Sequence, residues 1–255
     1  MGTAQRVAVV TGAAQGIGKR TADLLAERGW ALVLLDLRAA APRAGARALT
    51  LEGDVASEAF AEDAAARTMA EYGRVDALVN NAGISCILPA LETPADTYRR
   101  VLEINLVGPF LLAKAFGRRM LEAGSGAVVN VASVAGLRGV ASRSAYNASK
   151  HGVIGLTRTL AVEWGARGVR VNAVCPGWVK TEMDAKDQAG NYDDADITEH
   201  VPMGRFARPD DIAEAIAWLC DGERSAFVNG AALPVDGGWD ADGSWRSLRL
   251  SHRPG

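Results

Sequence analysis

The segment Val7-Ala8-Val9-Val10-Thr11-Gly12-Ala13-Ala14-Gln15-Gly16-Ile17-Gly18 decides the fold, because a glycine-rich turn joins a short apolar run to the start of a helical pattern. Glycine lets the backbone turn tightly and approach a bound group closely. The N-terminus of the following helix offers unpaired N–H groups and the positive end of a dipole to an anion. Glycine turns also serve as plain connections, but a strand before the turn and a helix after it predict a dinucleotide site formed by Gly12, Gln15, Gly16, Ile17 and Gly18.

Similar apolar runs recur along the chain, and helical patterns follow most of them. The runs lack polar alternation, which is typical of parallel strands covered by helices on both faces. We therefore expect an α/β fold: a single doubly wound Rossmann domain with a mainly parallel seven-stranded sheet and right-handed crossovers. The strands are predicted at 6–10, 31–35, 48–51, 77–79, 126–131, 169–174 and 230–235, and the helices at 17–28, 57–72, 94–123, 145–167 and 209–219. Gly29, Gly73 and Gly168 are expected to end three of these helices with positive φ.

Two segments depart from this alternation. Residues 179–208 form a long polar stretch that predicts a loop with short helices beside the substrate. Residues 240–255 follow the last strand and are expected to form a C-terminal tail, with Trp245, Leu248 and Leu250 as docking points. The predicted catalytic and cofactor-binding domain therefore covers residues 1–239.

The overall composition limits the classes of partner that the protein is expected to bind. Lys and Arg total 28 against 30 for Asp and Glu, so no strong field favours nucleic acid or an anionic membrane. No stretch approaches the roughly 20 apolar residues of a membrane span, and the start of the chain has no secretory pattern. The cysteines, Cys86, Cys175 and Cys220, lie far apart without metal-ligand spacing. These features predict a cytoplasmic protein with reduced cysteines, no metal and a small-molecule substrate.

Asp36 ends the second predicted strand, about 20 residues beyond the glycine turn. A carboxylate there can accept hydrogen bonds from the adenosine ribose hydroxyls and would repel a 2′-phosphate. It could instead simply end an exposed strand, and the nearby Arg38 could pair with a phosphate. The pattern favours NAD as the cofactor and leaves NADP possible.

Tyr146 and Lys150 are four residues apart in a helical stretch and therefore share one face. Lowering the pKa of a phenol from ~10 to neutrality requires roughly 4 kcal/mol of preferential stabilisation of the phenolate. A neighbouring ammonium in a partly desolvated cleft, together with an oxidised nicotinamide ring, can supply it. The bare pair is usually only a solvated helix face, but Ser133 follows a predicted strand at the edge where open parallel sheets bind ligands. Read alone, Ser133 is a turn or helix cap.

Taken together, these motifs resemble the short-chain dehydrogenase/reductase family of about 250 residues, and the resemblance extends from Arg6 to Gly238. It rests on the glycine turn and on motifs that occur in the family's order: Asp54-Val55, Asn80-Asn81-Ala82-Gly83, Asn105, Ser133, Tyr146 with Lys150, Pro176-Gly177, Thr181 and Asp236-Gly237-Gly238. Read alone, several of these are ordinary turn residues.

The resemblance implies a role for each matching position. Asp54 and Val55 would contact the adenine, and Asn81, Ala82 and Gly83 would line the cofactor path. The backbone of Asn105 would hold a water linked to Lys150. Ser133 and Tyr146 would bind the substrate oxygen, with Tyr146 as acid or base and Lys150 on the cofactor ribose. The nicotinamide would be wrapped by four further residues: Pro176, Gly177, Val179 and Thr181.

The resemblance also implies a reaction, hydride exchange between a secondary alcohol and its ketone, and an assembly, a homotetramer. Ser85, Ile87, Trp178 and residues 134–140 and 183–201 would line the substrate pocket. Asp36 and the absence of basic residues at 122–125 favour a free alcohol, polyol or sugar-like substrate, although Arg167 is basic. Two alternatives stay open: an NADPH-dependent reductase of 3-oxoacyl groups on acyl carrier protein or coenzyme A, and a non-catalytic dinucleotide-binding regulator.

Overall fold

The structure, a computed structural model, describes residues 5–183, 185 and 193–244. Its strands are β1 (Val7–Thr11), β2 (Ala31–Asp36), β3 (Ala48–Glu52), β4 (Ala77–Asn80), β5 (Gly126–Val131), β6 (Val169–Pro176) and β7 (Ala232–Val235). The α-helices are α1 (Gly16–Glu27), α2 (Glu58–Tyr72), α3 (Ala95–Leu102), α4 (Gly108–Ala123), α5 (Ser144–Gly165), α7 (Asp194–His200) and α8 (Pro209–Cys220). Shorter helical segments are η1 (Ala90–Glu92), η2 (Glu103–Val107) and η3 (Val134–Gly136).

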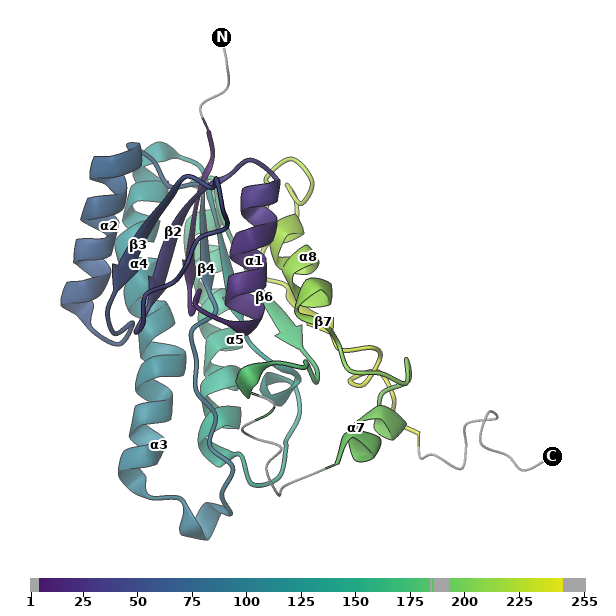
Figure 1. Ribbon diagram of the computed structural model, residues 1–255. Coiled ribbons are helices and arrows are strands. Elements are labelled where there is room, and N and C mark those ends of the chain that lie inside the picture. Colours follow the sequence, from purple (N-terminus) through teal and green to yellow (C-terminus); the bar gives the residue numbers. More distant parts are fainter. Residues whose placement is uncertain (1–4, 184, 186–192, 245–255) are drawn as a thin grey trace.

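The seven strands form one parallel sheet in the order β3-β2-β1-β4-β5-β6-β7. Helices α1 and α8 cover one face, and α2 and α4 lie on the other (Figure 1). The strand order reverses between β1 and β4, and such a switch point opens a crevice at the carboxyl ends of the strands. The predicted fold class is confirmed.

Strand β1 shows why its sequence forms a central strand. Val7 and Val9 pack into the core on the α2 and α4 side, whereas Ala8 and Val10 pack into the core under α1 and α8. Successive side chains point to opposite faces of a sheet, so a strand buried on both sides must be apolar at every position.

Gly29, Gly73 and Gly168 have the predicted positive φ, at 80°, 69° and 79°. Gly29 and Gly73 lie at the ends of α1 and α2, but α5 already ends at Gly165, and Gly168 belongs to the turn that follows it. Helix α2 begins at Ser57, whose hydroxyl accepts a hydrogen bond from the Phe60 amide at 3.3 Å. Capping of this kind satisfies main-chain groups that have no partner inside the helix.

The single helix predicted at 94–123 is wrong, because α3 and α4 are separated by η2, a turn of π-helix. Pro109 has no amide hydrogen and cannot donate to the carbonyl four residues earlier, which belongs to Asn105. The Gly108 amide instead bonds the Glu103 carbonyl, five residues earlier. The wider turn places Asn105 inside η2, and π-turns occur frequently at functional sites. The last strand also begins at Ala232, two residues later than predicted.

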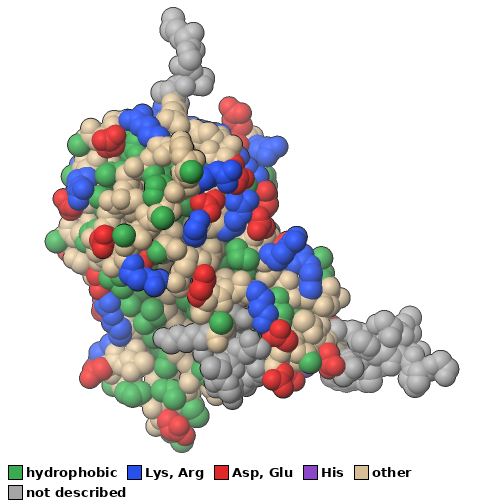
Figure 2. All heavy atoms as spheres, in the orientation of Figure 1, with side chains coloured by type: hydrophobic (Ala, Val, Ile, Leu, Met, Phe, Trp, Pro, Cys, Tyr) green, Lys and Arg blue, Asp and Glu red, His purple; other side chains and the backbone are tan. Residues whose placement is uncertain are grey.

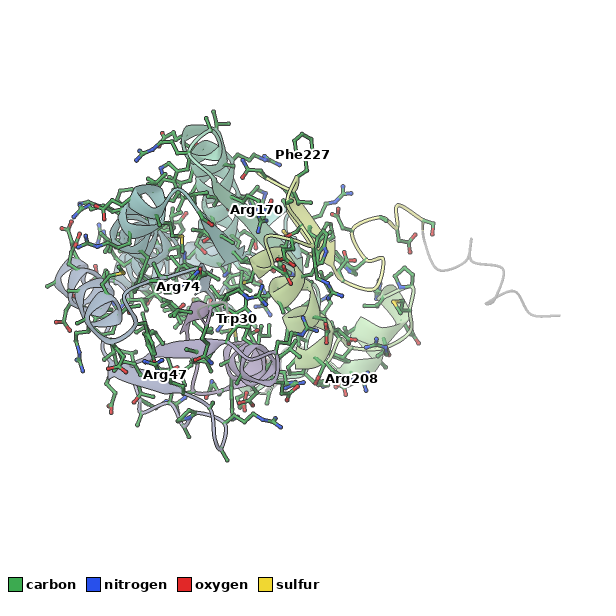
Figure 3. All side chains as sticks on the ribbon, turned by 90° about the horizontal axis from the view of Figure 1, so that it is seen from above. Trp30, Arg47, Arg74, Arg170, Arg208 and Phe227 are labelled. Carbon is green, nitrogen blue, oxygen red and sulfur yellow. The ribbon has the colours of Figure 1, made fainter. Side chains whose placement is uncertain are left out.

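A side chain on β6 ties the end of α8 and the segment before β7 to the sheet. Arg170 on β6 donates to the carbonyls of Leu219 and Val228 at 2.9 and 3.4 Å, which fastens α8 to the sheet, and Phe227 points away from the body of the fold (Figure 3). Burial lowers the pKa of Arg170.

Cys175 and Cys220 are buried, and burial raises their pKa to about 11 and about 12, so both thiols stay protonated.

Charges on the surface are mixed. Blue and red side chains are interspersed over the face shown in Figure 2. Several of them form ion pairs between helices, such as Lys114 of α4 with Glu58 of α2. No helix in the described part of the chain is long and apolar enough to cross a membrane.

Candidate functional site

Two adjoining cavities lie at the carboxyl ends of the central strands. The nucleotide cavity has a volume of about 210 Å³ and runs from the glycine turn past Asp36 and Asp54. The substrate cavity has a volume of about 150 Å³ and contains Ser133, Tyr146 and Lys150. Five residues line both: Ile17, Asn81, Gly83, Thr181 and Met183.

The structure brings nearly all the predicted cofactor residues to these cavities. Gly12, Gln15, Gly16, Val55 and Ala82 line the nucleotide cavity, and Pro176, Gly177 and Val179 line the substrate cavity. Gly18 lines neither. A Cβ there would overlap the Gly12 carbonyl and the Asn81 amide group, so this glycine serves close packing of the turn.

The glycine turn is shaped to receive an anion. Gly12 and Gly16 have φ of 62° and 56°, in the left-handed region that favours glycine. Gln15 precedes α1 without a side-chain cap, and the first turn of α1 carries no acidic residue. The positive end of the helix is therefore not neutralised by the helix's own side chains, which suits a pyrophosphate.

Asp36 lines the nucleotide cavity next to the glycine turn. Its carboxylate accepts hydrogen bonds from the Ala14 amide at 2.9 Å and the Arg38 amide at 3.2 Å. The exposed Arg38 guanidinium donates to the Gln15 side chain at 2.6 Å. These contacts hold a negative charge beside the glycine turn, where it can accept from ribose hydroxyls.

Asp54 is fixed at the rim. It accepts from the Ala56 amide at 3.0 Å and from Arg100 of α3 at 2.7 Å. Partial burial acts to raise the pKa of Asp54, but these two donors outweigh it and hold the pKa below its ordinary value. The carboxylate is thus ionised and acts only as an acceptor, as an exocyclic amino group requires.

Thr11 joins the two turns that carry predicted cofactor residues, and sequence reasoning did not single it out. Its hydroxyl accepts from the amides of Asn81 and Ala82, each at 2.9 Å. The Asn81 side chain donates in return to the carbonyls of Thr11 and Gly12 at 2.9 and 3.2 Å. The signal in the sequence was a polar residue at the end of a fully apolar strand.

Lys150 lies at the floor of the substrate cavity with 5% of its surface exposed. Its Nζ donates to the Val131 carbonyl at 2.7 Å and lies 5.5 Å from the centroid of the Tyr146 ring. Burial lowers the pKa of Lys150 from 10.5 to about 8. At neutral pH the side chain is an ammonium that is poorly hydrated and close to the phenol.

Ser133 both caps a helix and lines the substrate cavity, so the two interpretations of its position are compatible. Its hydroxyl accepts from the Ala135 amide at 3.1 Å and so caps η3, and the same side chain lines the substrate cavity. The hydroxyl can still donate to an oxygen in the cavity, because a serine has one donor and two acceptor sites.

Asn105 does not line the substrate cavity but holds its surroundings. Its amide group donates to the Ile84 carbonyl at 2.9 Å and to Ser149 at 3.2 Å, and its oxygen accepts from the Ile84 amide at 2.9 Å. A Cβ on Gly83 would lie 3.2 Å from the Asn105 oxygen and 3.8 Å from the Lys150 nitrogen. Asn105 and Lys150 therefore both approach the same glycine, where a side chain would crowd them.

Arg143 is a wall residue that sequence reasoning missed. It lines the substrate cavity, donates to Ser85 at 2.9 Å and lies 5.6 Å from the centroid of the Trp178 ring. The preceding Ser142 has φ of 57°, the only non-glycine residue in the left-handed region among those the structure describes. This conformation costs roughly 1–2 kcal/mol and is typical of ligand sites. Its carbonyl accepts from the Leu88 amide at 2.9 Å.

Residues 184 and 186–192 of the predicted pocket lie outside the described residues, as do the predicted docking points of the tail, Trp245, Leu248 and Leu250. Within the described residues no group of His, Cys, Asp and Glu is arranged to hold a metal ion. The predicted short helix in the polar loop is α7, and Asp193 and Asp196 form a capping box at its start.

Comparison with known proteins places this geometry in a family. A family model described as "Enoyl-(Acyl carrier protein) reductase" matches residues 12–240. D-threitol dehydrogenase of Mycolicibacterium smegmatis is 44% identical over 244 residues, covering 92% of this chain and 92% of that protein. Cis-4-hydroxycyclohexanecarboxylate dehydrogenase of Sinomonas cyclohexanicum is 47% identical over 246 residues, covering 93% of this chain and 98% of that protein.

A solved structure of a related dehydrogenase supports the same family assignment. A putative NAD(P)-dependent gluconate 5-dehydrogenase from Beutenbergia cavernae, with NADP bound at low occupancy, superposes with a TM-score of 0.87 at 40% identity. The match covers 94% of this chain and 98% of that one. The chain is an oxidoreductase that interconverts alcohols and ketones, and it belongs to the short-chain dehydrogenase/reductase family.

Proposed function

We propose that the protein is an NAD-dependent dehydrogenase of a secondary alcohol, polyol or sugar-like substrate. The observation that carries this proposal is one cavity containing Ser133, Tyr146 and Lys150 that opens into a second cavity lined by the glycine turn. The left-handed glycines, the uncapped start of α1 and the carboxylate of Asp36 fit a dinucleotide.

The residues would divide the chemistry as follows. Ser133 donates a hydrogen bond to the substrate oxygen and orients it. Tyr146, as a phenolate, accepts the proton of the substrate hydroxyl, and the O–H bond breaks as its electrons form the carbonyl. The Lys150 ammonium favours the phenolate by its charge and binds the ribose of the cofactor. A bound nicotinamide supplies the acceptor for the hydride that leaves the same carbon. In the reverse direction Tyr146 returns the proton to the ketone oxygen.

Asn105 has a supporting place in this scheme. Its side chain forms hydrogen bonds with Ile84 and Ser149. Its main-chain carbonyl cannot accept from residue 109, four positions later, because Pro109 has no amide hydrogen. We assign this carbonyl the role of holding a water that relays protons from Lys150 to solvent.

The cofactor assignment rests on charge. Asp36 would lie beside the adenosine ribose, where it can accept from two hydroxyls but repels a phosphate. Arg38 is the feature that would admit NADP, but its guanidinium is directed to Gln15. NAD is therefore the proposed cofactor, and the relative binding of NADH and NADPH tests it.

The related enzymes guide the substrate choice, since their names specify a polyol, a cyclic hydroxy acid and a sugar acid. All three are small free alcohols, which supports such a substrate over a 3-oxoacyl group on a carrier protein. A regulator without turnover is disfavoured because none of the four predicted catalytic positions is replaced.

We further propose a cytoplasmic homotetramer. Phe110 on α4, Val162 on α5 and Phe227 in the segment before β7 are exposed large apolar residues, as surfaces buried between subunits would require. The three cysteines are all unpaired, as in a reducing compartment. Light scattering after gel filtration would give the mass, and four times 26.7 kDa is expected.

The test of the function is reduction of NAD⁺ across a panel of D-threitol, glycerol, gluconate, cis-4-hydroxycyclohexanecarboxylate and a 3-hydroxyacyl thioester. We expect turnover with at least one free alcohol and little with the thioester. The Tyr146→Phe variant should bind NADH normally, as followed by nicotinamide fluorescence, and should lose about 10²–10⁴-fold in kcat. Turnover close to that of the unmodified enzyme would refute the acid–base role.

A further inference from the structure

The charges in the wall of the substrate cavity are unevenly placed. Arg143 and Lys150 are the charged side chains among the described wall residues, and both are cations. Lys150 lies at the floor, with its nitrogen on the Val131 carbonyl. Arg143 is 9% exposed and lies where the segment after β4 meets the start of α5. Much of the remaining wall is apolar, including Val134, Val140 and Trp178.

Several contacts hold the Arg143 guanidinium in place. One nitrogen donates to Ser85 at 2.9 Å, and the group lies over the Trp178 ring. The backbone of Arg143 forms an isolated bridge with Leu88, next to the left-handed Ser142. A cation fixed in this way forms part of the cavity and differs from a mobile surface charge.

Arg143 is three residues before Tyr146, the proposed acid or base, and lines the same cavity. A small molecule whose hydroxyl lies at Tyr146 and Ser133 can therefore reach the guanidinium with its other end. The planar fork of a guanidinium matches the two oxygens of a carboxylate. A phosphate would also match the fork, but its nearly two charges would face one arginine in a wall that is otherwise largely apolar.

From this placement we propose that Arg143 binds a carboxylate on the substrate, which makes the preferred substrate class of this site a hydroxy acid. The inference rests on the proposed alcohol dehydrogenase function and deepens it. Arg143 then sets specificity by charge, while Ser133 and Tyr146 carry out the reaction.

The experiment compares two substrates of similar shape, the anion cis-4-hydroxycyclohexanecarboxylate and its neutral primary amide, in the unmodified enzyme and in the Arg143→Gln variant. We expect the unmodified enzyme to prefer the acid, and the variant to lose about 10- to 100-fold in kcat/KM for the acid and little for the amide. That loss corresponds to about 1.4–2.7 kcal/mol. Arg143→Lys should keep part of the preference, because it keeps the charge without the fork.

Arg138→Gln is the matched control, since this arginine lies in the same connection but pairs with Asp240 at 2.7 Å and does not line the substrate cavity. It should change both substrates by the same factor. Equal losses for acid and amide in Arg143→Gln would show a structural role and overturn the proposal. Good turnover of polyols with no preference for the acid would also overturn it and leave the dehydrogenase function intact. Absence of turnover with the whole panel would instead refute the proposed function.

Discussion

Replacing Lys150 by methionine should stabilise the apo-protein at neutral pH while abolishing its activity. Burial lowers the pKa of Lys150 from 10.5 to about 8, and a difference of that size corresponds to about 3 kcal/mol against the folded state. Methionine fills a similar space without the charge. It also removes the hydrogen bond to the Val131 carbonyl, which costs about 1 kcal/mol. The expected net gain in the free energy of unfolding at pH 7 is therefore about 2 kcal/mol.

The sign of the pH dependence follows from proton binding. Below pH 8 lysine is protonated in both the folded and unfolded states, so the unmodified protein carries the full cost of burial. Between pH 8 and 10.5 the folded protein releases the proton while the unfolded chain retains it, so the free energy of unfolding rises with pH. Above 10.5 the cost is gone and only the lost hydrogen bond remains. The advantage of Lys150→Met should therefore shrink across this window and reverse at its upper end.

The assay is equilibrium unfolding in urea at several pH values from 7 to 10.5, at one protein concentration and without nucleotide. Other groups titrate equally in both proteins and cancel in the difference. Lys114→Met is the control for removing a lysine, because this side chain is on the surface beside Glu58. A difference between Lys150→Met and the unmodified protein that stays constant from pH 7 to 10.5 would refute the reasoning.

Three further variants test other parts of the site. Thr11→Val removes the acceptor of two main-chain amides and should lower the free energy of unfolding in urea by about 2 kcal/mol, with Thr11→Ser close to the unmodified protein. Asp36→Ala removes the charge that repels a 2′-phosphate and should shift relative affinity from NADH toward NADPH by about tenfold or more in fluorescence titrations; an unchanged ratio would contradict the role of Asp36. Gly18→Ala should weaken NADH binding at least about tenfold in calorimetry, since its methyl group meets the Gly12 carbonyl; unchanged affinity would show that the turn can adjust.

The sheet was predictable because its signal is local. Most of the strands are apolar runs, and a run of this kind can be recognised without knowledge of its neighbours. The prediction of one helix at 94–123 was wrong for a physical reason that is visible in the sequence. Pro109 lies in the middle of the predicted helix, and a proline there removes a main-chain hydrogen bond. The proline therefore indicates a break in the helix near Pro109, although the apolar periodicity continues through it.

The candidate site was predictable where it depends on strand ends, as at Asp36 and Ser133. It was not predictable at Arg143, because its location in the cavity depends on the bridge with Leu88, which joins segments far apart in the chain. Thr11 was missed for a related reason: its hydroxyl bonds the turn after β4, and nothing in its own strand indicates that partner.

Two unfavourable features of the described structure lie in the connection from β5 through α5. Lys150 lines the substrate cavity, and Ser142 directly precedes Arg143, which also lines it. Ser142 holds a backbone conformation that costs roughly 1–2 kcal/mol, and Lys150 buries a charge at a cost of about 3 kcal/mol. A glycine at 142 and a methionine at 150 would remove most of these costs without altering the sheet or the helices. Packing therefore does not explain either residue. Lys150 is explained by the proton chemistry proposed for Tyr146, and the backbone at Ser142 by the position it gives to the guanidinium of Arg143.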